Sequence, residues 1–233
     1  MRAAIRLGRI LGIPIDVNFS WIITFALLTY LMVGQFDDSR LRWSLAQSWV
    51  VALTTVLLFF LSVLAHELSH SAMALYKGIP VRGITLFIFG GVSQLDKEPE
   101  RPLIEFVVAL IGPLVSIILA SIFGLTWYLL GRGDSPLEVV LFLLAWTNLS
   151  IGMFNLVPGY PLDGGRLLRA GIWGFTGNHY KATLIAAGMG QVVGLALVLG
   201  GAFLAVFTDV VDGIWLGCIG MFLFLMARHS FPK

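Results

Sequence analysis

The sequence predicts a membrane protein of the all-α class, with six transmembrane helices and a small β-hairpin or sheet embedded among them. Apolar residues make up 58% of the 233 residues, and charged residues only 12%. That charged share is about half of what a soluble chain carries. Mean hydropathy is +0.91. Charges this sparse cannot cover a water-facing surface, so we expect lipid to be the solvent for much of the chain.

Charge and cysteine content exclude other classes. The 15 Lys and Arg against 13 Asp and Glu give a net charge of +2, which is too weak a bias for nucleic-acid binding. One cysteine cannot form an intramolecular disulfide. The high apolar content excludes a disordered chain. We therefore expect a lipid bilayer as a partner and no nucleic acid.

Six long uncharged windows predict the helices. Each can cross a hydrocarbon core of about 30 Å at about 1.5 Å per residue, the last one only if its flanking valines are included. The expected spans are residues 17–36, 43–75, 103–131, 137–157, 182–208 and 210–228. The chain contains no internal repeat and no linker between folded parts. Residues 1–233 are therefore expected to form a single transmembrane domain.

One uncharged segment is too short to cross a bilayer. Residues 83–95 (GITLFIFGGVSQL) are rich in β-branched and aromatic side chains, with Gly90 and Gly91 near the middle. This pattern predicts a hairpin or small sheet within a β segment at residues 81–97. Backbone of this kind exists at membrane depth only where protein or a water-filled cavity satisfies it. Residues 5–17 are a candidate for another strand.

The basic residues predict the orientation. An even number of spans places both termini on one side, and that side carries all of the Lys and Arg except Arg40, Arg42 and Arg132. Because the cytoplasmic loops of membrane proteins carry an excess of Lys and Arg, we expect a multi-pass protein with cytoplasmic N- and C-termini.

The sequence His66-Glu67-Leu68-Ser69-His70 is an HExxH motif. On a helix, positions i and i+4 share a face, so both imidazoles can reach one Zn²⁺. Glu67 would then lie beside the metal-bound water as a general base. The motif continues an apolar run, where titratable groups are costly and usually functional. The alternatives are a histidine pair that is hydrogen-bonded between helices and a helix end that emerges into water.

Asp163 is the candidate third ligand, because a catalytic zinc normally has three protein ligands. It ends an apolar run in the segment 155–165, NLVPGYPLDGG. Pro158 and Pro161 prevent a regular helix there, and the following glycines permit tight backbone. The alternative is that Asp163 caps the N-terminus of a following helix.

With these motifs, the chain resembles the site-2 protease family of intramembrane zinc metalloproteases. The segments HELSH (66–70) and NLVPGYPLDGG (155–165) carry the resemblance, and GPLVS (112–116) is similar to the family's small-residue motif. The glycine pair in LFIFGGVSQL looks like the membrane-embedded sheet of family members, near the active site. The resemblance runs from about residue 5 to 170. It implies that the zinc ligands are His66, His70 and Asp163, that the base is Glu67, and that Asn155 is a substrate or oxyanion contact.

The expected activity is that of a zinc-dependent metalloendopeptidase, with one Zn²⁺ per chain. It would hydrolyse peptide bonds within or near transmembrane segments of membrane proteins, as in regulated intramembrane proteolysis. Its active site would lie toward the cytoplasmic side, since His66 and His70 shortly precede Lys77. We expect a short form of the family, without a PDZ insertion or C-terminal nucleotide-sensing domains.

The expected substrate is a transmembrane protein that is pre-cleaved or locally unwound, because an intact helix hides its carbonyls in hydrogen bonds. An edge strand within residues 83–95 is expected to hold the substrate extended by β-augmentation. Gly90 and Gly91 are the expected substrate-binding residues of this strand, and Asn155 is expected to contact the same segment.

Two other functions use the same ligands. One is a membrane zinc transporter or metal-binding protein, although the uncharged parts of the spans leave no further intramembrane acid or histidine to pass the ion along a path. The other is a zincin of a different type that acts at the membrane surface, which would not need the 155–165 loop.

Outside these motifs, we expect structural roles. Glu105 has Arg101 four residues earlier, so an interfacial pair is expected. Arg166 and Arg169 are expected to extend toward the cytoplasmic interface. Gly112 and Ser116 have a small-xxx-small spacing, which suits helix packing as well as catalysis.

Overall fold

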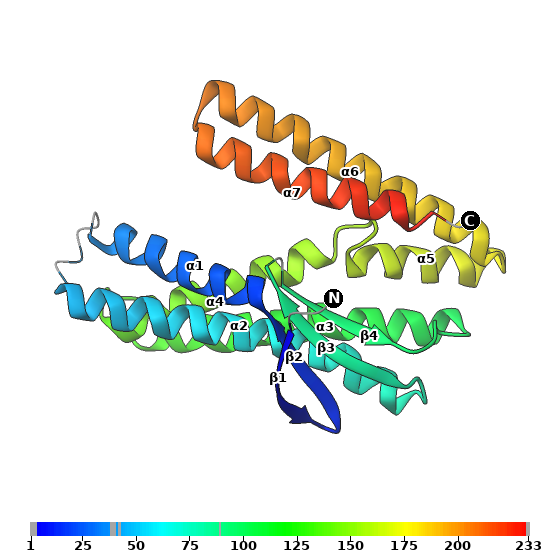
Figure 1. Cartoon of the computed structure of the whole chain (residues 1–233), viewed down its shortest axis with the longest axis horizontal. Coiled ribbons are helices and arrows are strands. Elements are labelled where there is room, and N and C mark those ends of the chain that lie inside the picture. Colours follow the sequence, from blue (N-terminus) through cyan, green and yellow to red (C-terminus); the bar gives the residue numbers. More distant parts are fainter. Residues whose placement is uncertain (1–3, 38–40, 42, 89, 232–233) are drawn as a thin grey trace. The chain divides into compact units, whose positions relative to one another are not determined.

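The structure, a computed structural model, describes residues 4–37, 41, 43–88 and 90–231 (Figure 1). It divides into two compact units. The first comprises the chain up to Glu98 together with Ile111–Gly152, and the second comprises Pro99–Leu110 together with Met153–Lys233. The single domain expected for residues 1–233 stays a prediction.

The helices confirm the predicted fold class. They are α1 (Phe19–Asp37), α2 (Leu45–Tyr76), α3 (Pro102–Leu129), α4 (Pro136–Asn155), α5 (Asp163–Thr176), α6 (His179–Phe207) and α7 (Val210–His229). Among the described residues, six helices are long and apolar enough to cross a membrane, namely all except α5. They match the six expected spans to within a few residues. The protein is therefore an integral membrane protein.

The remaining regular structure is one four-stranded sheet in the first unit. Its strands are β1 (Ala4–Ile10), β2 (Ile13–Asn18), β3 (Val81–Phe87) and β4 (Gly90–Leu95), in the order β1-β2-β3-β4. The β1–β2 and β3–β4 pairs are antiparallel, and β2 runs parallel to β3. Residue 89 of the predicted hairpin lies outside the described residues. β3 is an interior strand, so the edge of the predicted hairpin is β4.

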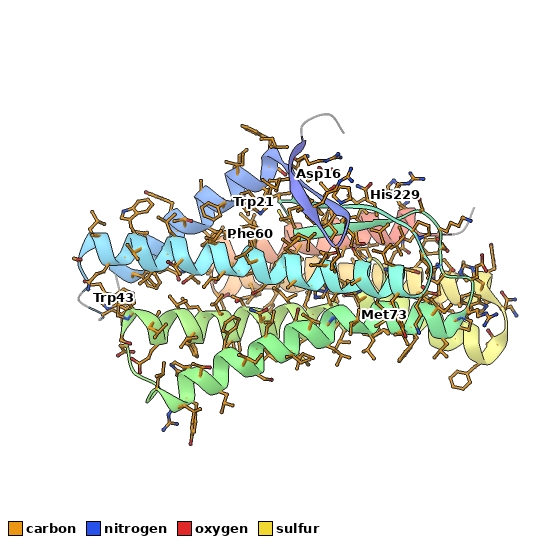
Figure 2. The ribbon with its side chains drawn as sticks, turned by 90° about the horizontal axis from the view of Figure 1, so that it is seen from below. Asp16, Trp21, Trp43, Phe60, Met73 and His229 are labelled. Carbon is orange, nitrogen blue, oxygen red and sulfur yellow. The ribbon has the colours of Figure 1, made fainter. Side chains whose placement is uncertain are left out.

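The sheet packs on α2 through a small apolar core. Alternate residues of β2 and β3 point to one face, as the period of two requires. The core consists of Ile13, Ile15, Val17, Val63, Ile84 and Leu86, all buried. Beside it, the Trp21 ring of α1 packs on Phe60 of α2, with ring centroids 4.9 Å apart (Figure 2). The long helix α2 is thus held against both the sheet and α1.

Glycines pair α6 with α7 in the second unit, and Figure 1 shows these two helices running side by side. A Cβ on Gly194 would lie 2.6 Å from the backbone nitrogen of Phe224, and one on Gly220 would lie 2.6 Å from that of Val198. Only residues without a side chain allow backbones to approach this closely.

Helix α5 was expected only in the alternative in which Asp163 caps a following helix. It begins at Asp163, directly after the proline-containing loop, and ends at Gly177, which has a left-handed φ of 66°. Proline before a helix and glycine after it are the ordinary boundary signals. Its 14 residues are too few to cross a membrane, and its two arginines interrupt any uncharged window.

Two predictions about charged residues were wrong. Glu105 is fully buried and pairs with Arg169, not with Arg101. Arg169 is therefore buried in the second unit and does not extend to the interface. The orientation stays a prediction, and two residues on which it depends, Arg40 and Arg42, lie outside the described residues.

Candidate metal centre

Helix α2 brings His66 and His70 together. Their side chains lie one turn apart and are almost completely buried, with 3% and 4% exposure. The two Nε2 atoms are 3.2 Å apart. Two ring nitrogens therefore face one point on the buried side of this helix.

This geometry fits a zinc ion. Zinc binds histidine nitrogen at about 2.0–2.1 Å, usually with tetrahedral coordination, which puts two nitrogen ligands about 3.3 Å apart. The observed Nε2–Nε2 separation of 3.2 Å agrees with that value. Among the described residues, the candidate metal ligands are His66, His70 and Asp163, each offering one ligand atom. Two imidazoles and one carboxylate form the donor set of many catalytic zinc sites.

Ser116 of α3 orients the first histidine. Its Oγ lies 2.9 Å from His66 Nδ1, and both side chains are buried. In the tautomer with the proton on Nδ1, His66 donates to Ser116 and presents the Nε2 lone pair. Such outer partners fix ring orientation and raise ligand basicity in metal sites. The sequence had marked Ser116 only by its small-residue spacing and did not predict this hydrogen bond.

Gly112 brings the backbone of α3 against both imidazoles. A Cβ at this position would lie 2.8 Å from His66 Nε2 and 2.5 Å from His70 Cε1, and still closer to His70 Nε2. The space is thus available only because Gly112 has no side chain. Gly112 and Ser116 together make α3 the second wall around the histidine pair.

Strand β4 holds Glu67. The Ser93 backbone N–H donates to Glu67 Oε2 at 3.1 Å. A Cβ on Gly91 would lie 2.5 Å from Glu67 Cγ, so the glycine permits this approach. The Ser71 and Ser93 hydroxyls, 2.7 Å apart, tie α2 to β4 once more. The edge strand therefore runs beside the candidate base, through contacts that the sequence did not predict.

The two predicted glycines differ. Gly91 contacts Glu67, whereas a Cβ on Gly90 would meet no atom within 4 Å. Gly90 instead has a φ of +129°, which L side chains rarely adopt. Gly90 thus begins β4 after the turn, and Gly91 gives Glu67 its space. Their binding of substrate stays a prediction.

The second unit carries Asn155 and Asp163. Asn155 is the last residue of α4 and Asp163 the first of α5; both are half-buried. Leu162 occupies the N-cap of α5 without a side-chain hydrogen bond, so Asp163 is not the cap. A Cβ on Gly164 would lie 2.5 Å from the carbonyl carbon of Leu156, so the loop before α5 is tightly wound. The loop therefore holds Asp163 by close backbone packing.

Comparison with known proteins identifies the family. The model of peptidase family M50 matches residues 54–135 and 132–201. The chain is 42% identical over 235 residues to sll0528 of Synechocystis sp., covering 99% of this chain and 60% of that protein. It is 37% identical over 232 residues to Rip3 of Mycobacterium tuberculosis, covering 99% and 59%. Both relatives carry "zinc metalloprotease" in their names. The chain thus spans about 60% of the length of these curated relatives.

A solved structure shares the fold. The site-2 protease from Methanocaldococcus jannaschii matches with a TM-score of 0.67 and 32% sequence identity, covering 99% of this chain and 96% of that one. The matched regions contain the HExxH motif and the loop that precedes α5. The chain therefore belongs to peptidase family M50, as its resemblance to the site-2 proteases implied.

Proposed function

We propose that this chain is an intramembrane zinc metalloprotease that hydrolyses peptide bonds within or near transmembrane segments of membrane proteins. The observation that carries the proposal is the buried His66–His70 pair with Glu67 beside the edge strand β4. A histidine pair that is only structural would need neither a carboxylate nor the edge strand of a sheet next to it.

One Zn²⁺ per chain is held by His66, His70 and Asp163. Two neutral imidazoles and one anionic carboxylate suit zinc, which prefers nitrogen and oxygen donors in this number at catalytic sites. The bound ion supplies Lewis acidity, which polarises a peptide carbonyl and makes water more acidic. The ligand chemistry, the burial of both histidines and the family support this assignment.

Glu67 is the general base. Its carboxylate accepts a proton from the attacking water and passes it to the leaving amine. The Ser93 N–H holds one carboxylate oxygen in place. Asn155 is proposed to donate a side-chain N–H to the developing oxyanion or to the substrate backbone.

The substrate lies extended along β4. Because the Ser93 N–H points to Glu67 and not to β3, the N–H groups of Gly91 and Leu95 share that outward direction. We propose that they pair with a locally unwound or pre-cleaved segment, by addition of a strand to the sheet. This replaces the hydrogen bonds that the segment loses when its helix opens within the membrane.

The proposed orientation has cytoplasmic termini and an active site toward the cytoplasm. The test of the function is cleavage in proteoliposomes that contain the purified chain and a transmembrane substrate with a helix-breaking residue. We expect cleavage that a zinc chelator stops and added Zn²⁺ restores. If the zinc-loaded chain instead moves Zn²⁺ into the vesicles and cleaves nothing, the chain is a transporter and the proposal is wrong.

A further inference from the structure

The second unit buries an ion pair that the proposed chemistry does not use. Glu105, in the first turn of α3, has no exposed surface, and Arg169 of α5 is 6% exposed. Glu105 Oε1 accepts from Arg169 Nε at 2.7 Å and lies 2.5 Å from Nη2. Glu105 Oε2 is buried and has no hydrogen-bond partner among the described residues. Burying two charges carries a desolvation penalty that such a pair often fails to recover, so stability alone explains it poorly.

Arg169 links the loop before Asp163 to the start of α3. It lies six residues after Asp163 on the short helix α5. Its guanidinium also lies over the ring of Tyr160, 5.4 Å from the centroid, which is within cation–π range. Tyr160 belongs to the loop that precedes Asp163. One arginine therefore joins the loop before this carboxylate, the helix after it and the start of α3.

The same loop is held from the other side by α6. The Tyr160 backbone N–H donates to the carbonyl of Ala186 at 3.1 Å. A Cβ on Gly159 would lie 2.7 Å from the Cα of Gly190, so loop and helix are in direct backbone contact. Arginine suits the position of residue 169, because its planar guanidinium can bind a carboxylate with two nitrogens and stack on an aromatic ring at the same time. Lysine carries its charge on a single nitrogen and cannot do both.

We infer that Glu105 and Arg169 are positioning residues for Asp163, an inference that rests on the proposed role of Asp163 as the third zinc ligand. In a metal site, the distance from the metal to each ligand atom varies by only about 0.2 Å, so each ligand has to be placed accurately. Helix α5 has only 14 residues and no side-chain cap at its N-terminus, so its own structure holds Asp163 weakly. The ion pair and the Tyr160 contact fix α5 and its loop as one piece.

The decisive variant is Glu105→Met/Arg169→Met, which removes both charges and keeps the volume. Replacing a buried pair by apolar residues is often neutral or stabilising for the fold, so the metal-free variant should keep its Tm. A positioning role predicts that zinc is lost to a chelator about 10–100-fold faster than from wild type. It also predicts an altered visible spectrum of the Co²⁺-substituted protein, which reports ligand geometry. A purely structural role predicts wild-type values for both.

Two further variants keep the inference testable if the double variant does not fold. Arg169→Lys keeps the charge but loses the fork and the stacking, and it should also release zinc faster and change the Co²⁺ spectrum. The exposed pair Arg6–Asp16, with Nε and Oδ1 3.0 Å apart, is the matched control. Its double variant Arg6→Gln/Asp16→Asn should release zinc at the wild-type rate.

Asp163→Asn, measured in parallel, separates this inference from the proposed function. If Asp163→Asn retains zinc as wild type does, the proposed ligand set is wrong and the inference falls with it. If Asp163→Asn loses zinc while the Glu105 and Arg169 variants keep the wild-type release rate and Co²⁺ spectrum, the ion pair does not position Asp163. In that case the proposed function stands.

Discussion

Replacing Gly112 by alanine should weaken zinc binding strongly without harming the fold. The added Cβ would lie 2.5 Å from His70 Cε1 and 2.8 Å from His66 Nε2, whereas ordinary contact begins at 3.4 Å. The His70 ring would have to move by at least about 0.9 Å, since its Nε2 is closer still, and this is several times the tolerance of about 0.2 Å for a metal ligand. No flexible chain end is available to give way, because both neighbours are rings held on the same helix.

The expected loss in zinc affinity is at least about 100-fold, the upper end for changes around a metal site. It can be measured by titrating the purified protein against a chelator of known affinity and by counting zinc per chain after dialysis. Peptide cleavage should fall in parallel.

The matched control is Gly124→Ala in the same helix. There the added Cβ would meet only Ala145 Cβ, at an ordinary 3.6 Å. Both variants replace glycine in a helix interior, which favours helix formation by about 0.5–1 kcal/mol, so neither should weaken α3 itself. If Gly112→Ala binds zinc as tightly as Gly124→Ala does, Gly112 does not border the metal site and the account of α3 is wrong.

Three other predictions concern two neighbouring contacts and the sequence of the substrate. Gly91→Ala would place a Cβ 2.5 Å from Glu67 Cγ, so kcat should fall by about 100-fold while zinc content stays the same; a wild-type kcat would argue against the β4 contact. Ser116→Ala removes the partner of His66 Nδ1 and should weaken zinc binding about 10–100-fold in chelator competition, and Ser116→Thr, which keeps the hydroxyl, should restore part of it. Substrates with Gly, Pro or Asn near the cleavage site should be cut faster than Leu/Ala-rich ones in the liposome assay, and equal rates would contradict the need for unwinding.

The transmembrane helices could be predicted because a long run of uncharged residues is enough to identify a membrane span, and such a run can be seen in consecutive residues of the sequence. The HExxH motif was equally local, since positions i and i+4 of one helix share a face. The sheet was predicted in part. The glycine pair and the β-branched residues indicated the hairpin, but its pairing with β2 joins segments about 70 residues apart and left no signal in either strand.

Glu105 shows why the long-range contacts could not be predicted. Arg101, four residues earlier, was the nearest cation in the sequence, and so it was the expected partner. The partner is Arg169, 64 residues away, because α5 brings a buried guanidinium to the start of α3. The hydrogen bonds of Ser116 and Ser93 were missed for the same reason, since each joins residues of different elements.

The central claim is that Glu67 is the base of a zinc peptidase and not a zinc ligand. The direct test is to measure zinc content and cleavage of a transmembrane substrate together for Glu67→Gln and for His66→Ala/His70→Ala. We expect Glu67→Gln to keep one zinc per chain and lose cleavage, and the double histidine variant to lose both. Cleavage at the wild-type rate by Glu67→Gln, or a full complement of zinc in the double variant, would contradict the account.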